Sequence, residues 1–218
     1  MNKIFFFAII LCFCSCIDRM CDDAGIPYEF EIPLRFEPAR DTFNIGDTIT
    51  VEIRFSQMTF ERTEAKRFDI GEFNFDPVCS IDEISDVMPN DGLDYFDLLT
   101  SENSEIERFF FQSGNSLLCL QYMPEGEELF CVFKLVAKRT GLFFIKFGDV
   151  LELEKIEPNV PGGCRNRGVR FFFHTNGGGG NNVEFLLNSP DTLYSHRIYQ
   201  RAEVDFHKGG GYVFYVVE

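Results

Sequence analysis

The chain has 218 residues, of which 35 are Asp or Glu and 20 are Lys or Arg, so its formal net charge at pH 7 is −15. Nucleic-acid binding depends on a basic surface that releases counterions from phosphates, so this charge excludes DNA and RNA as partners. The 27 phenylalanines supply ample apolar surface for a hydrophobic core, although tryptophan is absent, and this argues against a disordered chain.

The first 15 residues have the order of a secretory signal peptide. Lys3 supplies one early positive charge, an uninterrupted apolar run follows from Ile4 to Phe13, and small or cysteine residues come next. This run is much shorter than the roughly 20 residues that a membrane-spanning helix needs, and no later apolar run is long enough either. We therefore expect residues 1–15 to be a removed signal and nothing to span a membrane. Loss of Lys3 leaves 19 basic residues against 35 acidic ones, a net charge of −16.

The signal ends in Phe13-Cys14-Ser15-Cys16, which resembles the lipobox of bacterial lipoproteins, where a small residue precedes the lipidated cysteine. Ser15 fits the small position, so the resemblance implies that Cys16 carries the lipid. The sequence departs from the family pattern because Phe13 stands where Leu is usual, and Cys14 where Ala, Ser or Thr is usual. Cys14 and Cys12 therefore remain alternative lipidation sites, and a plain secreted protein remains an alternative interpretation.

Residues 16–27 are polar and without periodicity, which is typical of a flexible tether between a lipid anchor and a folded domain. Asp18, Asp22 and Asp23 lie close to the anchor, and this stretch resembles the acidic start of some Bacteroidota-type lipoproteins. The resemblance implies a lipid anchor in the outer membrane of the cell envelope. Display on the surface and a periplasm-facing anchor both remain open.

Residues 28–56 predict two strands. Apolar residues alternate over 28–36 and again over 48–55, and Gly46-Asp47 supplies a turn between them. Pro33 interrupts the first strand and cannot donate to a ladder, so it indicates an edge or a bulge. Two alternating strands in succession indicate an antiparallel sheet. The stretch also resembles the opening of uncharacterised Bacteroidota surface lipoproteins with immunoglobulin-like bodies.

The middle of the chain changes period and then returns to strand patterns. Ser80-Ile-Asp-Glu83 has the form of a capping box, which predicts a short helix over residues 81–87. Strand patterns at Phe109–Phe111, 116–123, 128–138 and 142–147 predict a β-meander. Because its phenylalanine runs do not alternate, we expect central strands covered on both faces and interpret these runs as core packing.

The last quarter of the chain mixes both kinds of element. It predicts a strand over 169–175, a flexible loop over 176–182, a helix from about 190 to 201 and a terminal strand over 212–217. Residues 28–218 are therefore predicted to form one mostly β domain, an antiparallel immunoglobulin-like β-sandwich with one or two short helices.

No residue pattern predicts catalysis, a metal site or a cofactor. His174, His196 and His207 are not spaced as paired ligands on one helix face, and no nucleophile elbow or phosphate-binding glycine loop occurs. Asp91, Asp94 and Asp97 could supply carboxylates to calcium, but the order of ligands of an EF-hand is missing. We therefore predict neither a metal nor a cofactor.

Six cysteines remain after removal of the signal, and an exported compartment is oxidising enough to pair them. With Cys16 lipidated, at least one of the other five has to stay free or bond to another chain. Cys119 and Cys131 flank the predicted turn Pro124-Glu-Gly-Glu127. They would face each other, within disulfide reach, if the hairpin loop had an odd length, and point to opposite sheet faces if it were even. We place this pair slightly ahead of two buried thiols, and Cys79 with Cys164 as a less certain second bridge.

These features predict a cell-envelope lipoprotein that acts as a non-enzymatic binding or structural module. Its expected partners are the membrane, through the N-terminal lipid, and an envelope protein or a glycan. The alternative is an envelope hydrolase or glycan-binding protein that uses carboxylates and aromatic residues in its loops. The first hypothesis is favoured because loop contacts on a β-sandwich need no catalytic constellation.

Overall fold

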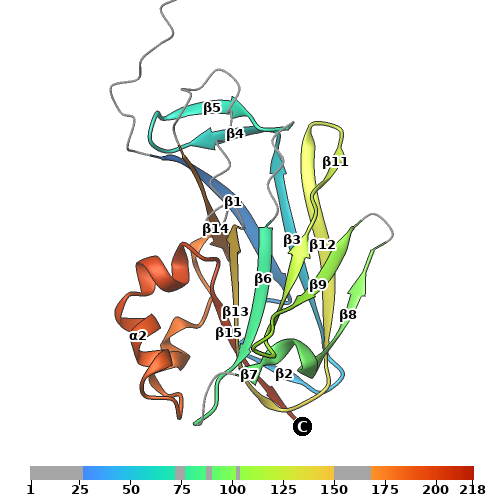
Figure 1. Ribbon diagram of the computed structural model, residues 1–218, viewed down its shortest axis with the longest axis vertical. Helices are drawn as coiled ribbons and strands as arrows, with labels where there is room; N and C mark the ends of the chain where they lie inside the picture. The colour runs from blue at the N-terminus through green and yellow to red at the C-terminus, as the bar shows by residue number, and fades with distance from the viewer. Residues whose placement is uncertain (1–26, 72–76, 87–89, 102–103, 150–167) are drawn as a thin grey trace, which may run out of the picture.

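The computed structural model describes residues 27–71, 77–86, 90–101, 104–149 and 168–218 (Figure 1). The predicted signal peptide, Cys16 and the tether up to residue 26 lie outside the described residues. Within the described part, no helix is both long and apolar enough to cross a membrane.

The fold is mostly β, with two facing sheets that form the predicted immunoglobulin-like sandwich. The first sheet has the order β11-β12-β3-β1-β4-β5, and β14 and β8 pair with β1 and β12. Its strands are β1 (Tyr28–Glu37), β3 (Thr48–Ser56), β4 (Met58–Glu61), β5 (Lys66–Asp69), β8 (Phe96–Thr100), β11 (Met123–Glu125), β12 (Glu128–Ala137) and β14 (Val169–Thr175).

The second sheet has the order β2-β15-β13-β6-β10-β9, with β7 beside β6. Its strands are β2 (Thr42–Asn44), β6 (Pro77–Glu83), β7 (Asn90–Asp91), β9 (Ile106–Phe110), β10 (Ser116–Leu120), β13 (Gly141–Asp149) and β15 (Tyr212–Val217). Most pairs are antiparallel, whereas β1–β14 and β2–β15 are parallel. The predicted terminal strand exists as β15 and lies inside the sheet, between β13 and β2.

The alternating patterns of β1 and β3 give each strand one buried face. Phe30, Ile32 and Leu34 are at most 2% exposed and point into the space between the sheets. Pro33 does not mark an edge, because β1 has partners on both sides. It lies between Phe30, which pairs with β4, and Leu34, where pairing with β3 begins. Pro33 has no backbone N–H, and it is tolerated because it lies where the neighbour of β1 changes from β4 to β3.

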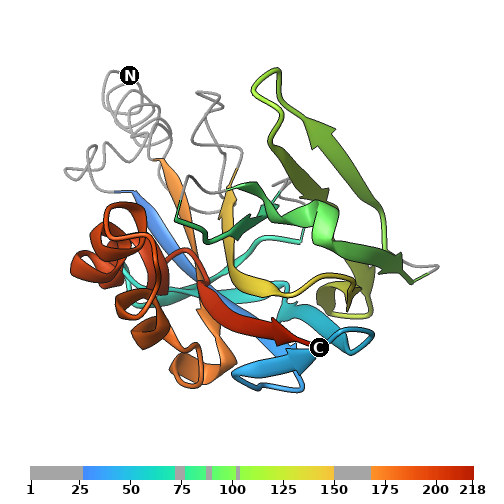
Figure 2. The same ribbon diagram turned by 90° about the horizontal axis from the view of Figure 1, so that it is seen from below.

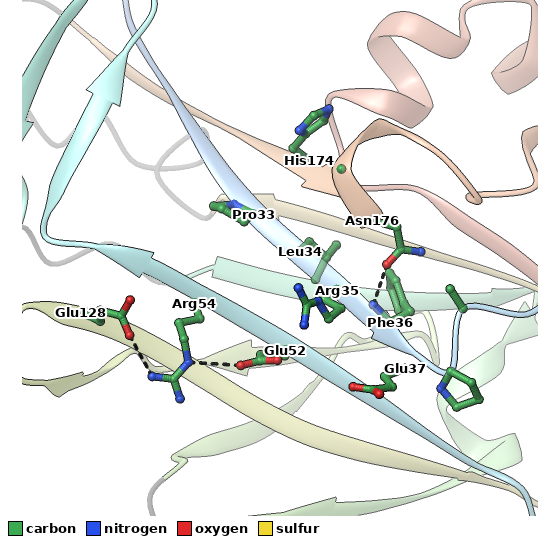
Figure 3. A pocket seen from close by; sticks show the side chains of 13 residues that line it. Pro33, Leu34, Arg35, Phe36, Glu37, Glu52, Arg54, Glu128, His174 and Asn176 are labelled. Carbon is green, nitrogen blue, oxygen red and sulfur yellow. Dashed lines mark hydrogen bonds and ion pairs between the residues drawn. The ribbon is translucent and has the colours of Figure 1, made fainter.

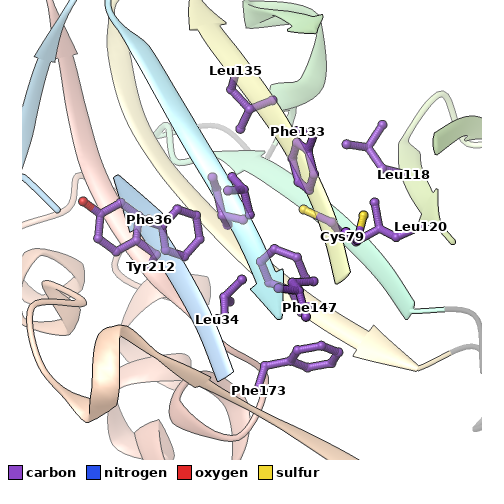
Figure 4. Packing of buried hydrophobic residues seen from close by; sticks show 14 of the residues in the cluster. Leu34, Phe36, Cys79, Leu118, Leu120, Phe133, Leu135, Phe147, Phe173 and Tyr212 are labelled. Atoms are coloured by element: carbon purple, nitrogen blue, oxygen red, sulfur yellow. The ribbon is translucent and has the colours of Figure 1, made fainter. Parts of the chain in front are cut away.

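Aromatic residues dominate the core between the sheets (Figure 4). The rings of Phe36 and Tyr212 stack with centroids 4.2 Å apart, and those of Phe30 and Phe171 lie 5.7 Å apart. Each buried ring removes on the order of 150–250 Å² from water, so these contacts supply much of the drive to fold.

A helical layer covers part of the outer face of the second sheet (Figure 1). Phe143 faces the sandwich core, whereas the next residue, Phe144, faces this layer, and both are fully buried. The non-alternating Phe143-Phe144 pair therefore marks a strand covered on both faces, as predicted. The helical elements in the described part of the chain are the 3-10 turns η1 (Gly92–Tyr95), η3 (Asn176–Gly178) and η4 (Val183–Leu187), the helix α2 (Tyr194–Gln200) and the π-helical turn η5 (Glu203–His207).

The helix predicted over 81–87 is wrong, because Ser80–Glu83 belong to strand β6. Cys79 and Ile81 alternate with more exposed neighbours, and β6 pairs with both β10 and β13. Burial and two ladders outweigh the local capping signal. The helix predicted from residue 190 begins only at Tyr194, since Asp191 accepts hydrogen bonds from the backbone N–H groups of Leu193 and Tyr194 ahead of it.

The predicted strands of the meander exist, but their connection as a meander is wrong. The chain passes from β10 in the second sheet to β11 and β12 in the first, and then back to β13 in the second. Only β9–β10 and β11–β12 pair as successive neighbours in this region. This region therefore contributes strands to both walls of the core rather than one continuous surface.

Candidate functional site

The predicted pairing of Cys119 with Cys131 is wrong in its register. Met123 pairs with Phe130, and Glu125 with Glu128, so the hairpin loop is Gly126-Glu127 and has an even length, the alternative in which the two cysteines do not face each other. Cys119 lies on β10 in the second sheet, whereas Cys131 lies on β12 in the first. The three cysteines in the described part of the chain, Cys79, Cys119 and Cys131, are all reduced thiols in the structure. Cys79 is buried on β6, and its predicted partner Cys164 lies outside the described residues.

Two of the three histidines line a small cavity of about 360 Å³ between β14 and the helical layer. His207 lies 3.1 Å from the amide of Asn181 through its Nδ1 atom, and His174 lies beside Gly178 on the other side of the cavity. His196 is elsewhere, on α2. Across the part of the chain that the structure describes, no three His, Cys, Asp or Glu residues converge as metal ligands do.

The carboxylates considered for calcium are used by basic side chains instead. Asp91 and Asp94 both contact the guanidinium of Arg108, at 3.1 and 2.6 Å. Asp97 pairs with Lys138 at 2.9 Å. Asp97 therefore pairs with a different basic residue from the other two carboxylates. Asp91 and Asp94 together hold Arg108, and with it strand β9, in place.

An open groove of about 850 Å³ lies on the outer face of the first sheet (Figure 3). Outward-pointing side chains of β1, β3 and β12 line it, among them Arg35, Glu52, Arg54 and Glu128. Asn176 closes one end by accepting a hydrogen bond from the backbone N–H of Phe36 at 2.9 Å. The groove is thus lined mainly by the outward-facing polar residues that alternate with buried apolar residues along these strands.

The charges in this groove largely satisfy one another. Arg54 contacts Glu52 at 3.1 Å, Glu125 at 2.7 Å and Glu128 at 3.0 Å. Hydrogen bonds to these three carboxylates raise the pKa of Arg54 further above its ordinary value. Carboxylates that are committed to an arginine are poorly placed to exchange protons with a substrate. The groove can accept a polar ligand, and its Glu52 and Glu128 carboxylates are engaged by Arg54.

Strand β9 forms an edge of the second sheet and pairs only with β10 in the described structure. The backbone N–H of Phe111 donates to Asn115 and that of Gln121 donates to Glu105, and these bonds fix the alternation of the ladder. Residues 105, 107, 109 and 111 therefore bond to β10, whereas the N–H and C=O groups of Ile106, Arg108 and Phe110 point to the open side. No bond from these outward groups is found among the described residues.

Three consecutive phenylalanines are exposed along this edge. Phe109 is 53% exposed, Phe110 63% and Phe111 43%. The rings of Phe109 and Phe111 meet edge to face at 5.2 Å on one side of the strand, and Arg108 covers the ring of Phe110 on the other at 4.7 Å. Figure 2 shows the β9–β10 hairpin, in yellow-green, projecting from the body of the sandwich. A contiguous exposed apolar surface often marks a site of protein–protein interaction.

The surroundings of the β9 edge are ordered and acidic. Arg108 holds the strand to Ser116 at 2.7 Å as well as to Asp91 and Asp94. Glu105 and Glu107 are exposed on or next to the strand. The edge therefore combines a fixed backbone, an aromatic surface and a local excess of negative charge.

The sequence interpretation missed this surface, because it assigned the Phe109–Phe111 run to the core. The signal that could have found it is the short strand itself, which is followed directly by polar turn residues and preceded by Glu105 and Glu107. A strand covered on both faces is longer and less charged, as β13 is. Two other edge strands differ from β9. The edge strand β5 carries Lys66 and Arg67, and the edge strand β2 is only three residues long. Both features commonly protect an edge strand from pairing with another chain.

No protein-family model matches the chain, and no curated protein matches its sequence. Distant similarity exists to solved structures. The second type II cohesin module of the adaptor ScaA scaffoldin of Acetivibrio cellulolyticus is 11% identical, with a TM-score of 0.33 over 66% of this chain and 86% of that one. The human F-spondin reeler domain is 12% identical, with a TM-score of 0.33 over 57% of this chain and 77% of that one. At this level of similarity, the neighbours say nothing about a ligand or a partner of this chain.

Proposed function

We propose that this protein is a lipid-anchored, non-enzymatic binding module of the cell envelope, and that it binds an extended segment of a partner protein along strand β9. The observation that carries this proposal is the open edge of β9, where the outward backbone groups of three residues have no partner among the described residues and lie beside three exposed phenylalanines. Addition of a strand to such an edge is an established mode of peptide recognition.

The chemistry of the edge specifies a polypeptide strand as its occupant. The N–H and C=O groups of Ile106, Arg108 and Phe110 recur every second residue, which matches the donors and acceptors of another strand. Side chains of the added strand would alternate between the Phe109 and Phe111 rings on one face and the Phe110 ring on the other. A glycan offers neither this repeat nor a matching ladder.

The charge of the protein specifies the charge of the partner. Glu105, Glu107 and the 68%-exposed side chain of Asp94 surround the edge, and the mature chain carries a predicted net charge of −16. Such a surface attracts cations and repels anions during encounter. The partner segment is therefore extended, apolar at alternate positions and basic at its flanks.

The position of the module at the envelope rests on the lipobox resemblance. A lipid on Cys16 would attach the domain to the membrane through the polar residues that follow it. We expect mass spectrometry of membrane-extracted protein to show a diacylated or triacylated N-terminal Cys16. Cys16→Ala should move the protein out of the membrane fraction, and an unchanged fraction would remove the anchor from the proposal.

Photo-crosslinking tests the binding edge directly. A benzophenone-bearing phenylalanine analogue replaces Phe109 in the full chain, which is expressed in its native cells and irradiated. We expect one dominant protein adduct, whose cross-linked peptide is an extended basic segment. The same analogue at Leu193, which is 84% exposed in the helical layer, is the control for nonspecific capture. An equal adduct from both positions would contradict the proposal, and a second copy of this chain as the adduct would replace the partner by self-association.

Two variants at Phe110 separate the role of the backbone from that of the ring. Phe110→Ala removes the ring and keeps the outward N–H, whereas Phe110→Pro removes both without breaking a bond to β10. Strand addition predicts a weaker Phe109 adduct with Ala and none with Pro. If Ala and Pro give the same adduct while both melt as the parent does, the partner reads only the aromatic surface, and strand addition is wrong.

A further inference from the structure

Two fully buried cysteines occupy opposite walls of the sandwich. Cys79 lies on β6, at the centre of the second sheet, between β10 and β13. Cys131 lies on β12 in the first sheet, opposite Ile53 of β3. Both residues are 0% exposed and belong to the same core cluster between the sheets. The two cysteines are therefore inner-face residues of facing sheets.

The alternation of each strand fixes the direction of both thiols. Cys79 shares its buried face with Pro77 and Ile81, and Cys131 shares its buried face with Leu129 and Phe133. Figure 4 shows Cys79 in the core, in the neighbourhood of Phe133 and Leu120. Phe133 follows Cys131 by two residues on the same face of β12, so the thiols approach one another across the core from the two sheets.

The electrostatics of the two thiols agree with this placement. Burial is the main cause that raises the pKa of Cys79 far above its ordinary value, and the nearby Cys131 thiolate is the next. Burial also raises the pKa of Cys131 to about 12. At neutral pH both groups are therefore protonated in the closed core, where they react slowly with any oxidant.

We propose that Cys79 and Cys131 become joined by a disulfide that ties the two sheets together when the chain is exported. This inference rests on the export half of the proposed function and is independent of the β9 edge. Cys119 is no substitute for either residue, because Leu118 and Leu120 occupy the inner face of β10 and Cys119 points to the outer one. The pairing replaces the two bridges that the sequence suggested.

The oxidant is the disulfide of a thiol–disulfide exchange protein, the class that oxidises exported chains. One cysteine thiolate attacks that disulfide, which forms a mixed disulfide and expels one thiolate of the exchange protein. The second cysteine thiolate then attacks the mixed disulfide, so that the bond between Cys79 and Cys131 forms and the exchange protein leaves as a dithiol. Two electrons pass to the exchange protein, and the two protons released by the cysteines are balanced, through solvent, by the two that protonate its thiolates.

Burial dictates when this exchange happens. An exchange protein has to reach the sulfur atoms, and both are inaccessible once the sheets close. The bond therefore forms while the chain is still folding, and the finished core then protects it from reductants. A chain that folds under reducing conditions keeps both thiols, because burial and the raised pKa block later oxidation.

Non-reducing peptide mapping tests the pair. The full chain is isolated from cells in the presence of N-ethylmaleimide, denatured, digested without reduction and analysed by mass spectrometry. We expect one linked peptide that contains Cys79 and Cys131, present in Cys119→Ser and absent from Cys79→Ser. Alkylation of both residues without reduction, or a link from either of them to another cysteine, would overturn the proposal.

Refolding of the isolated chain tests whether the two cysteines can form the bond at all, independently of whether the protein is exported. The reduced, unfolded full chain is refolded in detergent with a glutathione and glutathione-disulfide buffer, and in parallel refolded first and oxidised afterwards. We expect the link in the first order and at least tenfold less of it in the second. A link that forms on refolding but is absent from the cellular protein overturns the proposal for the cell and points to a failure of export. The β9 crosslink does not depend on either result.

Discussion

The carboxylate of Glu61 accepts a hydrogen bond from the backbone N–H of Glu29 at 2.7 Å, and so ties β4 to the first strand of the sandwich. It also accepts bonds from the backbone N–H groups of Thr63 and Glu64, although the residue is fully buried. Burial alone would raise the pKa of Glu61, but the three backbone donors outweigh it and hold the pKa below its ordinary value.

This carboxylate predicts a loss of stability in acid. A pKa that is lower in the folded state stabilises the fold above the unfolded pKa, here 4.5, and this contribution is lost as the pH falls through the folded value. We expect Glu61→Gln to lower the free energy of unfolding at pH 7 by about 1–3 kcal/mol and to flatten its dependence on pH below about 4.5.

Urea unfolding from pH 3 to 7 checks this prediction, with Glu31→Gln as its control. Glu31 is exposed and pairs with the exposed Arg62 at 3.3 Å, so its loss should cost less than about 1 kcal/mol. The same loss at pH 7 in both variants would contradict the role assigned to Glu61.

The contrast between two phenylalanine runs shows what sequence can predict here. Phe109–Phe111 and Phe143-Phe144 look alike as non-alternating apolar runs, and both were assigned to the core. The second run is buried because β13 lies between two strands and under the helical layer, whereas the first is exposed on an edge. The neighbours of a strand in its sheet decide this difference, and they are not encoded in the local pattern.

Period and turn chemistry predicted the strands themselves well. The alternation of β1 and β3, and the turn at Gly46 with a φ of +90°, agree with the structure. Register and sheet membership could not be predicted, because the chain changes sheet between β10 and β11. For this reason Cys119 and Cys131 do not share a hairpin, and Cys131 lies instead in the same core cluster as Cys79.

The helical layer should depend on one aromatic stack. Phe206 is fully buried and lies parallel to Phe144, with centroids 5.4 Å apart. We expect Phe206→Ala to cost about 3–5 kcal/mol, because it removes the ring and leaves a cavity under η5. Leu193→Ala, at a position that is 84% exposed, should change stability by less than about 0.5 kcal/mol. Denaturant unfolding of both variants checks this, and a Phe206→Ala cost below that of Leu193→Ala would contradict it.

A buried phenol should set an alkaline limit to stability. Burial raises the pKa of Tyr212 to about 12, and its hydroxyl accepts from the backbone N–H of Arg40 at 3.0 Å and donates to the carbonyl of the same residue. Because the folded pKa is raised, its contribution is complete below pH 10 and is lost as the pH rises towards 12.

Tyr212→Phe tests this contribution. We expect the variant to lose about 1–2 kcal/mol at pH 8, since two groups of Arg40 lose their partner, and to show a shallower decline between pH 10 and 12. Tyr199→Phe, at a position that is 36% exposed, is the matched control for removal of a hydroxyl. Unfolding curves measured from pH 8 to 12 decide the matter, and an unchanged alkaline decline would show that Tyr212 does not contribute to it.

Two glycines with nearly the same positive φ should respond very differently to alanine. Gly210 has a φ of +61° and Gly180 a φ of +63°, so alanine at either position incurs the same left-handed cost, about 1–2 kcal/mol. A Cβ atom at Gly210 would lie 2.6 Å from Cβ of Phe173 and 2.9 Å from Cδ2 of Leu34, whereas a Cβ at Gly180 meets nothing within 4 Å. Overpacking should therefore add about 1–3 kcal/mol for Gly210→Ala alone. Chemical unfolding of the two variants isolates this term, because their difference cancels the backbone cost. Equal losses would mean that the turn before β15 moves away from the core without penalty, and that Gly210 is required only for its φ.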